Sequence, residues 1–225
     1  MNEASVEILK TKSETEVVRK NMLYLFVKRT FDIVMSLISL ILLSPLFLIT
    51  IILIKLDSKG KATYTQDRVG YHSNKFKMYK FRTMIPNADE KLKELMENDP
   101  KIREEYTKYK KLDNDPRITK IGNFLRKTSI DELPQLLNIL KGEMSFVGNR
   151  PEVWRDYQPM GKYRDMVTST KPGLTGLWQV TGRSDTTFEE RLQIGCKYSK
   201  ECSLWLDIKI FFSTVKVVFK GEGAK

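Results

Sequence analysis

Two adjacent carboxylates, Asp131 and Glu132, lie in a stretch of the chain that is rich in arginine. Arg126 precedes Asp131 by five residues, and Arg150 follows Glu132 by 18 residues in a turn with glycine and proline. Arg183 follows a further glycine. Arginines in such turns suit bidentate binding of phosphate. Neighbouring carboxylates suit a divalent cation or a carboxylate nucleophile. These residues predict phosphoryl chemistry in which Mg²⁺ neutralises a diphosphate.

The same carboxylates also suit the start of a helix. Ser129 and Glu132 have the spacing of a capping box. With Asp131 as the N-cap instead, Pro134 would occupy the third helical position, where no intrahelical donor is needed. In both arrangements the pair lies at the N-terminus of a helix that continues to Leu140. The plainer alternative is that the carboxylates only complement the helix dipole.

Composition restricts the class of protein. The chain has 225 residues, which suits one domain with an appendage, and a net charge of +11, from 39 Lys and Arg against 28 Asp and Glu. This excess favours an anionic partner: nucleic acid, an acidic membrane surface or a phosphorylated substrate. The single histidine excludes a multi-histidine zinc site, and the two cysteines, Cys196 and Cys202, exclude a disulfide framework. Reduced thiols in a cytosolic compartment are expected.

One apolar segment indicates a membrane. Between Ile33 and Ile54 there is no charged residue for 22 positions. As a helix this segment would be about 33 Å long, enough to cross the hydrocarbon core. Ser44 and Pro45 interrupt it in the middle, where proline removes a backbone donor and kinks a helix. Ser44 could donate a hydrogen bond to a carbonyl that the proline leaves free.

Charge does not favour one orientation of this segment. Four cations precede it and four follow it within about 20 residues, so both ends are drawn to the cytoplasm: Arg19, Lys20, Lys28 and Arg29 before, and Lys55, Lys59, Lys61 and Arg68 after. Asp32 lies beside Lys28 and Arg29 in a cluster that could pair among lipid headgroups. A re-entrant helix-break-helix that returns on the same side is favoured, and a kinked span is the alternative.

The rest of the chain predicts an α+β fold that is mostly helical. Domain boundaries are expected at 1–58, a leading helix with the membrane anchor, and 59–225, a cytosolic catalytic domain. Short strands are expected at 62–66 and 75–82, and helices at 87–112 with a break at Asp99-Pro100, at 122–127, at 129–140 and at 203–219. The last helix has an apolar stripe, with lysines off it, that suits either a membrane interface or the domain core.

Eight short motifs in order give the chain a resemblance to a known family, over about residues 28 to 223. They are Lys28-Arg29 with Asp32, Ser44-Pro45, Gln66 to Gly70, Lys80 to Met84, Asp115 to Thr119, Phe124 to Gln135, Lys141 to Ser145 and Lys171 to Val180. With them the chain resembles the bacterial sugar transferases, the monotopic phosphoglycosyl transferases of polysaccharide assembly. It is most similar to short forms without a preceding four-helix domain, and to initiators of exopolysaccharide and capsule synthesis.

The resemblance implies a reaction and a set of site residues. A UDP-sugar would give its sugar-1-phosphate, expected to be a hexose-1-phosphate, to polyprenyl (undecaprenyl) phosphate, with release of UMP. Asp131 matches the family's nucleophile and Glu132 its Mg²⁺-associated partner. Arg126 and Arg150 match positions at which the family is thought to hold phosphates, and Arg183, Lys80 and Arg82 are also expected to bind substrate phosphate. The family's motifs also imply a re-entrant anchor broken at Ser44-Pro45, in the bacterial inner membrane with the site on the cytoplasmic face. Asn149 departs from the pattern, because many members have proline there.

Two other classes of protein remain as alternatives. One is a membrane-bound glycosyltransferase, which would release UDP and need no carboxylate nucleophile. The other is a membrane-anchored basic binding module. No helix-turn-helix, zinc-finger or RNA-recognition signature indicates a nucleic-acid partner, so none is expected. The expected partners are the UDP-sugar, polyprenyl phosphate and membrane lipids; homo-oligomerisation is left open.

Overall fold

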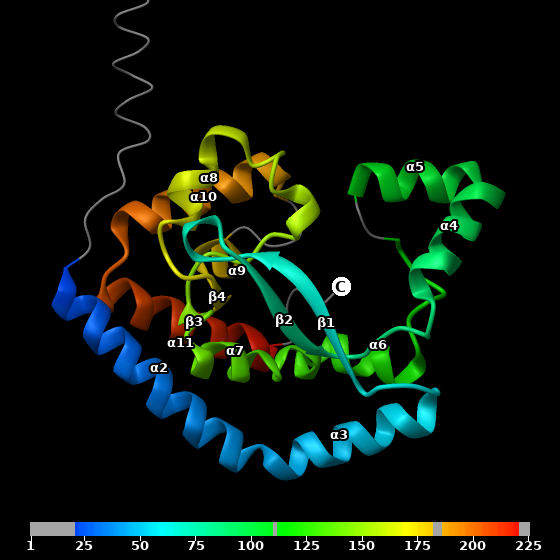
Figure 1. Cartoon of the computed structure of the whole chain (residues 1–225), viewed down its shortest axis with the longest axis horizontal. Helices are drawn as coiled ribbons and strands as arrows, with labels where there is room; N and C mark the ends of the chain where they lie inside the picture. Colours follow the sequence, from blue (N-terminus) through cyan, green and yellow to red (C-terminus); the bar gives the residue numbers. More distant parts are fainter. Residues whose placement is uncertain (1–20, 110–111, 182–185, 221–225) are drawn as a thin grey trace, which may run out of the picture.

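A computed structural model describes residues 21–109, 112–181 and 186–220. The described chain is mostly helical, with two small two-stranded sheets, which confirms the predicted α+β class. Figure 1 shows helices α2 (Met22–Leu42) and α3 (Ser44–Asp57) along one edge of the molecule, with the other described elements on one side of them. The predicted leading helix lies largely in residues 1–20, outside the described part.

The apolar segment forms two helices, α2 (Met22–Leu42) and α3 (Ser44–Asp57), which meet at an angle of 60°. Pro45 lies in the first turn of α3, where its missing N–H costs no intrahelical bond. The Ser44 hydroxyl donates to the Ile41 carbonyl over 2.8 Å, as the sequence predicted. The Ser-Pro pair therefore ends one helix and begins the next.

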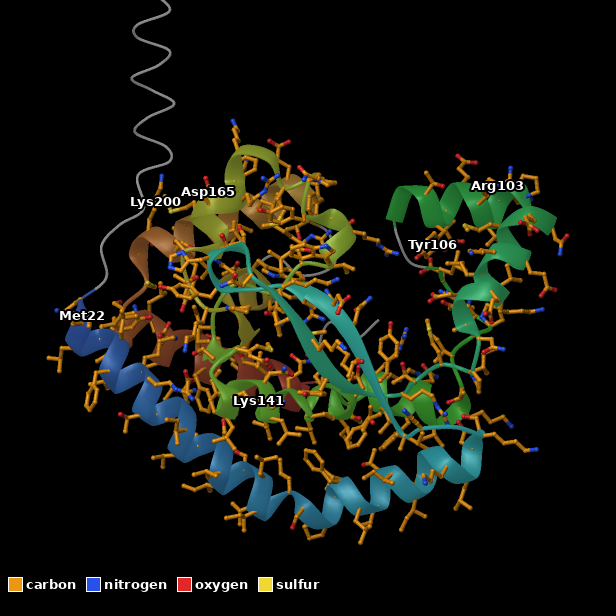
Figure 2. All side chains as sticks on the ribbon, in the orientation of Figure 1. Met22, Arg103, Tyr106, Lys141, Asp165 and Lys200 are labelled. Carbon is orange, nitrogen blue, oxygen red and sulfur yellow. The ribbon has the colours of Figure 1, made fainter. Side chains whose placement is uncertain are left out.

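The bent pair has an apolar outer face. No single helix in the described part is long and apolar enough to cross a bilayer; α2 and α3 reach that length and composition only together. Side chains along their outer edge project away from the rest of the protein in Figure 2. The exposed apolar residues of this face include Leu23, Phe26, Ile41, Leu42, Leu48, Ile49 and Leu56.

The two small sheets differ in the direction of their strands, and the second has a tight backbone contact beside it. Strands β1 (Thr63–Val69) and β2 (Lys75–Phe81) pair antiparallel through the turn η1 (Tyr71–Ser73), close to the predicted strand positions. Strands β3 (Ser145–Val147) and β4 (Gly173–Thr175) pair in parallel. A Cβ atom at Gly148 would lie 2.3 Å from the Lys171 carbonyl oxygen, so only glycine fits beside this second sheet.

The helices between and after the sheets enclose the core. The predicted helix at 87–112 is split at Pro100 as expected, and forms the arm that extends from the body in Figure 1. The elements are α4 (Ala88–Asn98), α5 (Pro100–Tyr109), α6 (Lys120–Lys127), η2 (Ile130–Glu132), α7 (Gln135–Lys141), η3 (Trp154–Asp156), η4 (Gly161–Tyr163), α8 (Arg164–Thr168), α9 (Leu177–Thr181), α10 (Phe188–Glu201) and α11 (Leu204–Lys220). The sequence analysis missed α8, α9, α10 and the second sheet.

Helix α11 has two apolar faces, and this combines the two alternatives for it. Ile210 is buried in the central core with Phe76, Ile139 and Tyr198. On the other side Trp205 and Phe212 are each 66% exposed. One face therefore packs on the domain, and the other is free to contact a further apolar surface.

The polar cluster at the start of the membrane segment is internal, which corrects its expected place among headgroups. Asp32 is only 2% exposed, and its Oδ1 accepts hydrogen bonds from the Ser145 hydroxyl and the Phe146 N–H, both at 3.0 Å. Arg29 donates to the carbonyls of the last turn of α7, and Lys28 donates to the Val147 carbonyl. These groups attach α2 to α7 and β3 because buried backbone carbonyls and N–H groups need partners.

We expect Asp32→Ala to destabilise the protein by about 2–4 kcal/mol, because two buried donors lose their acceptor and a small cavity is left. Asp32→Asn is the matched variant: it keeps the volume and one oxygen, and should cost less. Thermal unfolding in detergent, followed by near-UV circular dichroism, measures both. Equal melting temperatures for Asp32→Ala and the wild type would contradict the role of Asp32 as an internal attachment.

Candidate active site

Asp131 and Glu132 lie on a single 3₁₀ turn, η2, that precedes helix α7. Ser129 occupies the left-handed region with φ of 57°, and its side chain caps no N–H. Helix α7 begins only at Gln135, with Pro134 at the N-cap position. Both predicted capping arrangements are therefore wrong. The carboxylate of Glu132 turns away from the backbone because two cations offer it stronger partners.

Lys80 connects the two carboxylates. Its Nζ lies 2.8 Å from Glu132 Oε1 and 3.6 Å from Asp131 Oδ2. The side chains of Asp131 and Glu132 are 11% and 18% exposed, so little water screens the contact. A cation is needed here because two adjacent carboxylates repel each other in a poorly solvated site.

Arg150 approaches Glu132 from the loop after β3. Its Nη2 lies 2.9 Å from Glu132 Oε1, the same oxygen that Lys80 contacts. Asn149, the residue that departs from the family pattern, is 6% exposed and fixes this loop. Its amide donates to the Val167 carbonyl over 2.9 Å and to the Ser199 hydroxyl over 2.8 Å. An asparagine can therefore hold the turn that carries Arg150.

The two carboxylates have opposite pKa shifts. Burial raises the pKa of Asp131, and the positive charge of Lys80 only partly offsets this effect. For Glu132 the effect of burial is outweighed by Arg150 and Lys80, which hold its pKa well below the usual range. Glu132 is therefore a permanently ionised partner of the two cations, and Asp131 is the less stabilised and more basic carboxylate.

Arg126 faces the same site without an ion pair in the described residues. Its Nε donates to the Thr83 hydroxyl over 3.0 Å, and its charge lowers the pKa of Asp131. Asp115, which follows the arm of α4 and α5, forms a 2.6 Å ion pair with Arg117 instead. The Nη groups of Arg126 make no hydrogen bond within the described ranges, so they are available to an anion.

Two other predicted phosphate ligands are not brought to these carboxylates. Arg82 donates to the carbonyls of Ser58 and Lys59 and so caps the C-terminus of α3. Arg183 lies in 182–185, outside the described residues. Of the predicted cations, the structure brings Lys80, Arg126 and Arg150 to the carboxylates.

Arg68 lies near the site, but the sequence analysis used it only as a cation flanking the apolar segment and as part of a family motif. Its Nη1 donates to the Pro151 carbonyl over 2.9 Å, and its Nη2 donates to Gln66 Oε1 over 2.6 Å. Burial and the nearby charge of Arg150 lower the pKa of Arg68 to about 10. The pairing of Tyr64 with Lys80 and of Arg68 with Phe76 puts Arg68 on the same face of the hairpin as Lys80. The alternation of side chains along a strand could have indicated that Arg68 faces the site, but only if the pairing register of β1 and β2 had been known.

The donor set fits a Mg²⁺ ion of the kind that also binds substrate. Asp131 and Glu132 supply hard carboxylate oxygens, and Glu132 Oε2 accepts no hydrogen bond in the described part of the chain. No group of three or more His, Cys, Asp or Glu gathers among the described residues. One or two carboxylates completed by phosphate oxygens and water are a usual environment for Mg²⁺.

A buried carboxylate pair held by lysine and arginine, beside an arginine with free donors, is an arrangement suited to binding a phosphorylated ligand. Sequence comparison then gives the family: residues 23–221 match the model of the bacterial sugar transferases, and the chain belongs to that family.

Three relatives illustrate the similarity. The undecaprenyl-phosphate galactose phosphotransferase of Salmonella typhimurium is 50% identical over 199 residues, which cover 88% of this chain and 42% of the relative. The exopolysaccharide production protein ExoY of Rhizobium meliloti is 42% identical over 197 residues, 88% of this chain and 87% of ExoY. The UDP-glucose:undecaprenyl-phosphate glucose-1-phosphate transferase of Escherichia coli is 40% identical over 205 residues, 86% of this chain and 40% of the relative. The chain thus spans less than half of two of these relatives.

We expect Asp131→Asn to stabilise the protein at neutral pH. Because the pKa of Asp131 is raised in the folded state, its ionised form is less stable there than in the unfolded chain. The variant removes this cost. The gain should be full above the folded-state pKa and vanish below about pH 3.9, the ordinary pKa of aspartate.

Thermal unfolding of the two proteins at pH 7.5 and pH 4 measures the effect, at about 2–4 °C for each kcal/mol. Asp165→Asn, on the exposed surface of α8, is the matched control and should change little at either pH. A lower melting temperature for Asp131→Asn at pH 7.5 would contradict the argument.

Proposed function

We propose that this protein transfers a sugar-1-phosphate from a UDP-sugar to polyprenyl phosphate and releases UMP. The observation that carries the proposal is the difference between the two adjacent carboxylates. Glu132 is neutralised by Lys80 and Arg150, whereas Asp131 is buried, more basic and held by one weaker contact. A carboxylate with unused basicity beside phosphate-binding cations is suited to nucleophilic attack on phosphorus.

In the first step, an Asp131 oxygen attacks the phosphorus that carries the sugar. An acyl-phosphate bond forms between Asp131 and the phosphosugar, and the bond from this phosphorus to the bridging oxygen breaks. The oxygen and its electron pair leave with UMP. Lys80 contacts Asp131 and Arg150 binds the adjacent Glu132, so both cations are placed to stabilise the charge that accumulates on the phosphate oxygens.

In the second step, an oxygen of polyprenyl phosphate attacks the same phosphorus. The new diphosphate bond forms and the acyl-phosphate bond to Asp131 breaks, which regenerates the carboxylate. Arg126 has free guanidinium donors toward this site and is suited to hold the incoming phosphate. The Salmonella and Escherichia relatives, both named as transferases that act on undecaprenyl phosphate, support this class of acceptor.

A Mg²⁺ ion held by Asp131 and Glu132 would neutralise charge on the diphosphate. The protein itself orients Glu132 for this role through Lys80 and Arg150. Lys80 also contacts Asp131 over 3.6 Å, and the low exposure of both carboxylates limits the access of water to the aspartyl intermediate.

We further propose a monotopic membrane attachment with the site on the cytoplasmic face of the bacterial inner membrane. The exposed apolar side chains of α2 and α3 support it, together with Trp205 and Phe212 on the free face of α11. The cations on both sides of the bent pair favour a re-entrant path.

The reaction is tested by incubating the purified protein with polyprenyl phosphate, Mg²⁺ and a panel of UDP-sugars, and measuring UMP and UDP separately. We expect UMP, with loss of at least about 10³-fold in Asp131→Asn because no carboxylate remains to attack. Asp165→Asn should retain full activity. UDP release, or activity in Asp131→Asn, would instead support the glycosyltransferase alternative.

The topology is tested with single cysteines in place of Met22 and Lys59, which lie at opposite ends of the bent pair and are exposed. Cys196 and Cys202 are first replaced by serine. In intact cells we expect both positions to resist a membrane-impermeant maleimide and to react after permeabilisation. Labelling of one position alone in intact cells would show a spanning helix.

A further inference from the structure

Asn138 is a polar residue on α7 that is fully buried and has no role in the chemistry described above. The Tyr79 N–H donates to its Oδ1 over 3.0 Å. Its Nδ2 donates to the Lys77 carbonyl over 2.8 Å and to Glu143 Oε2 over 2.7 Å. Because a backbone N–H can only donate and a carbonyl can only accept, these contacts fix the orientation of the amide.

The amide of Asn138 lies against the open edge of β2, a strand that pairs with β1 on one side only. In an extended strand, the carbonyl of one residue and the N–H two residues later point to the same side. Asn138 therefore pairs with Lys77 and Tyr79 as a residue of a further strand would. Among the described residues, these two are the only hydrogen bonds between the backbone of β2 and an element other than β1.

These two hydrogen bonds complete a closed path through the site. Lys80 directly follows Tyr79, and Glu132 precedes Asn138 by six residues along a continuous run of 3₁₀ and α turns. The path closes where Lys80 Nζ lies 2.8 Å from Glu132 Oε1. The segment that carries the carboxylates thus holds the strand that carries Lys80 through the amide of Asn138.

Apolar packing alone would not fix the position of β2 along α7. Apolar side chains of both elements pack together in the central core, but such contacts have no preferred direction. One residue of a strand spans about 3.3 Å, and a displacement of that size would separate Lys80 from Asp131, which it contacts over 3.6 Å. The directional hydrogen bonds of Asn138 oppose this displacement.

We propose that Asn138 is a positioning residue for the transfer reaction, because it holds the Lys80 amine against Asp131 and Glu132. The inference rests on the proposed function, since Lys80 is assigned there to the charge on the transferred phosphate. The position of Lys80 itself can be measured without turnover, so the two proposals can fail separately.

The position of Lys80 is tested by the rate at which its amine reacts with acetic anhydride, measured by mass spectrometry on the full chain in detergent. Asn138→Leu has a similar volume but cannot pair with Lys77 or Tyr79. We expect Lys80 to react about tenfold faster in this variant, because a hydrogen bond to a charged group no longer protects it. Lys93, which is exposed on α4, is the internal reference and should react at an unchanged rate.

An unchanged rate for Lys80 in folded Asn138→Leu overturns the inference, whether or not the protein releases UMP. A faster rate supports the positioning of Lys80 even if the proposed function fails.

A double-mutant cycle links this position to the reaction, with UMP release as the readout. We expect Asn138→Leu to lower kcat/KM for the donor about 10- to 100-fold, because the Lys80 amine is displaced from the charge it stabilises. In Lys80→Met, which has no amine to position, Asn138→Leu should lower kcat/KM by no more than about twofold further. Losses that multiply would show a general structural role and overturn the inference.

Leu192→Ala controls for a general loss of stability. Leu192 is buried in a core cluster that contains no residue of α7 or β2. Its truncation should lower the melting temperature but leave kcat/KM and the reactivity of Lys80 unchanged. If Asn138→Leu does not fold, as judged by its melting temperature, Asn138→Asp replaces it. The new carboxylate can still accept from Tyr79 but repels the Lys77 carbonyl, so Lys80 should again react faster, and an unchanged rate overturns the inference.

Discussion

The contact of one oxygen of Glu132 with both Lys80 and Arg150 is the interaction on which the site depends. It joins three segments that are distant in sequence: the second strand of the hairpin, the 3₁₀ turn and the loop after β3. Two adjacent carboxylates would otherwise repel each other and draw in water. Burial raises the pKa of Asp131, and Lys80 only partly offsets this effect because it lies closer to Glu132. Unequal sharing of positive charge thus gives two neighbouring carboxylates different properties.

A second set of polar contacts connects the segments that carry the site to the apolar helix α2. Arg29 donates hydrogen bonds to the last carbonyls of α7, the helix that follows the 3₁₀ turn. Asp32 accepts hydrogen bonds from the start of β3, the strand that leads to Arg150. The segment that carries the carboxylates and the segment that carries Arg150 are therefore both attached to α2. The geometry of the site depends on an element whose opposite face is apolar and exposed.

Features set by local sequence could be predicted. The break at Ser44-Pro45, the split at Pro100 and the hairpin strands follow from proline chemistry and residue pattern. The sequence also held a missed local signal, since Thr187 and Glu190 form the capping box that begins α10. Features set by tertiary pairing could not be predicted. Whether Asp32 is internal, and whether Arg82 caps a helix or faces the site, depends on which distant carbonyls and N–H groups lie nearby.

The internal role of Asp32 and Arg29 limits how this protein can be redesigned for handling in water. Deletion of α2 would leave the carbonyls of α7 and the N–H and hydroxyl groups of β3 without partners in a buried region. A detergent-free form must therefore keep the whole helix and its inward polar residues. Only outward positions such as Leu23, Phe26 and Ile41 are open to polar replacement. Replaceable and indispensable residues therefore lie on opposite faces of the same helix, and not in separate segments of the chain.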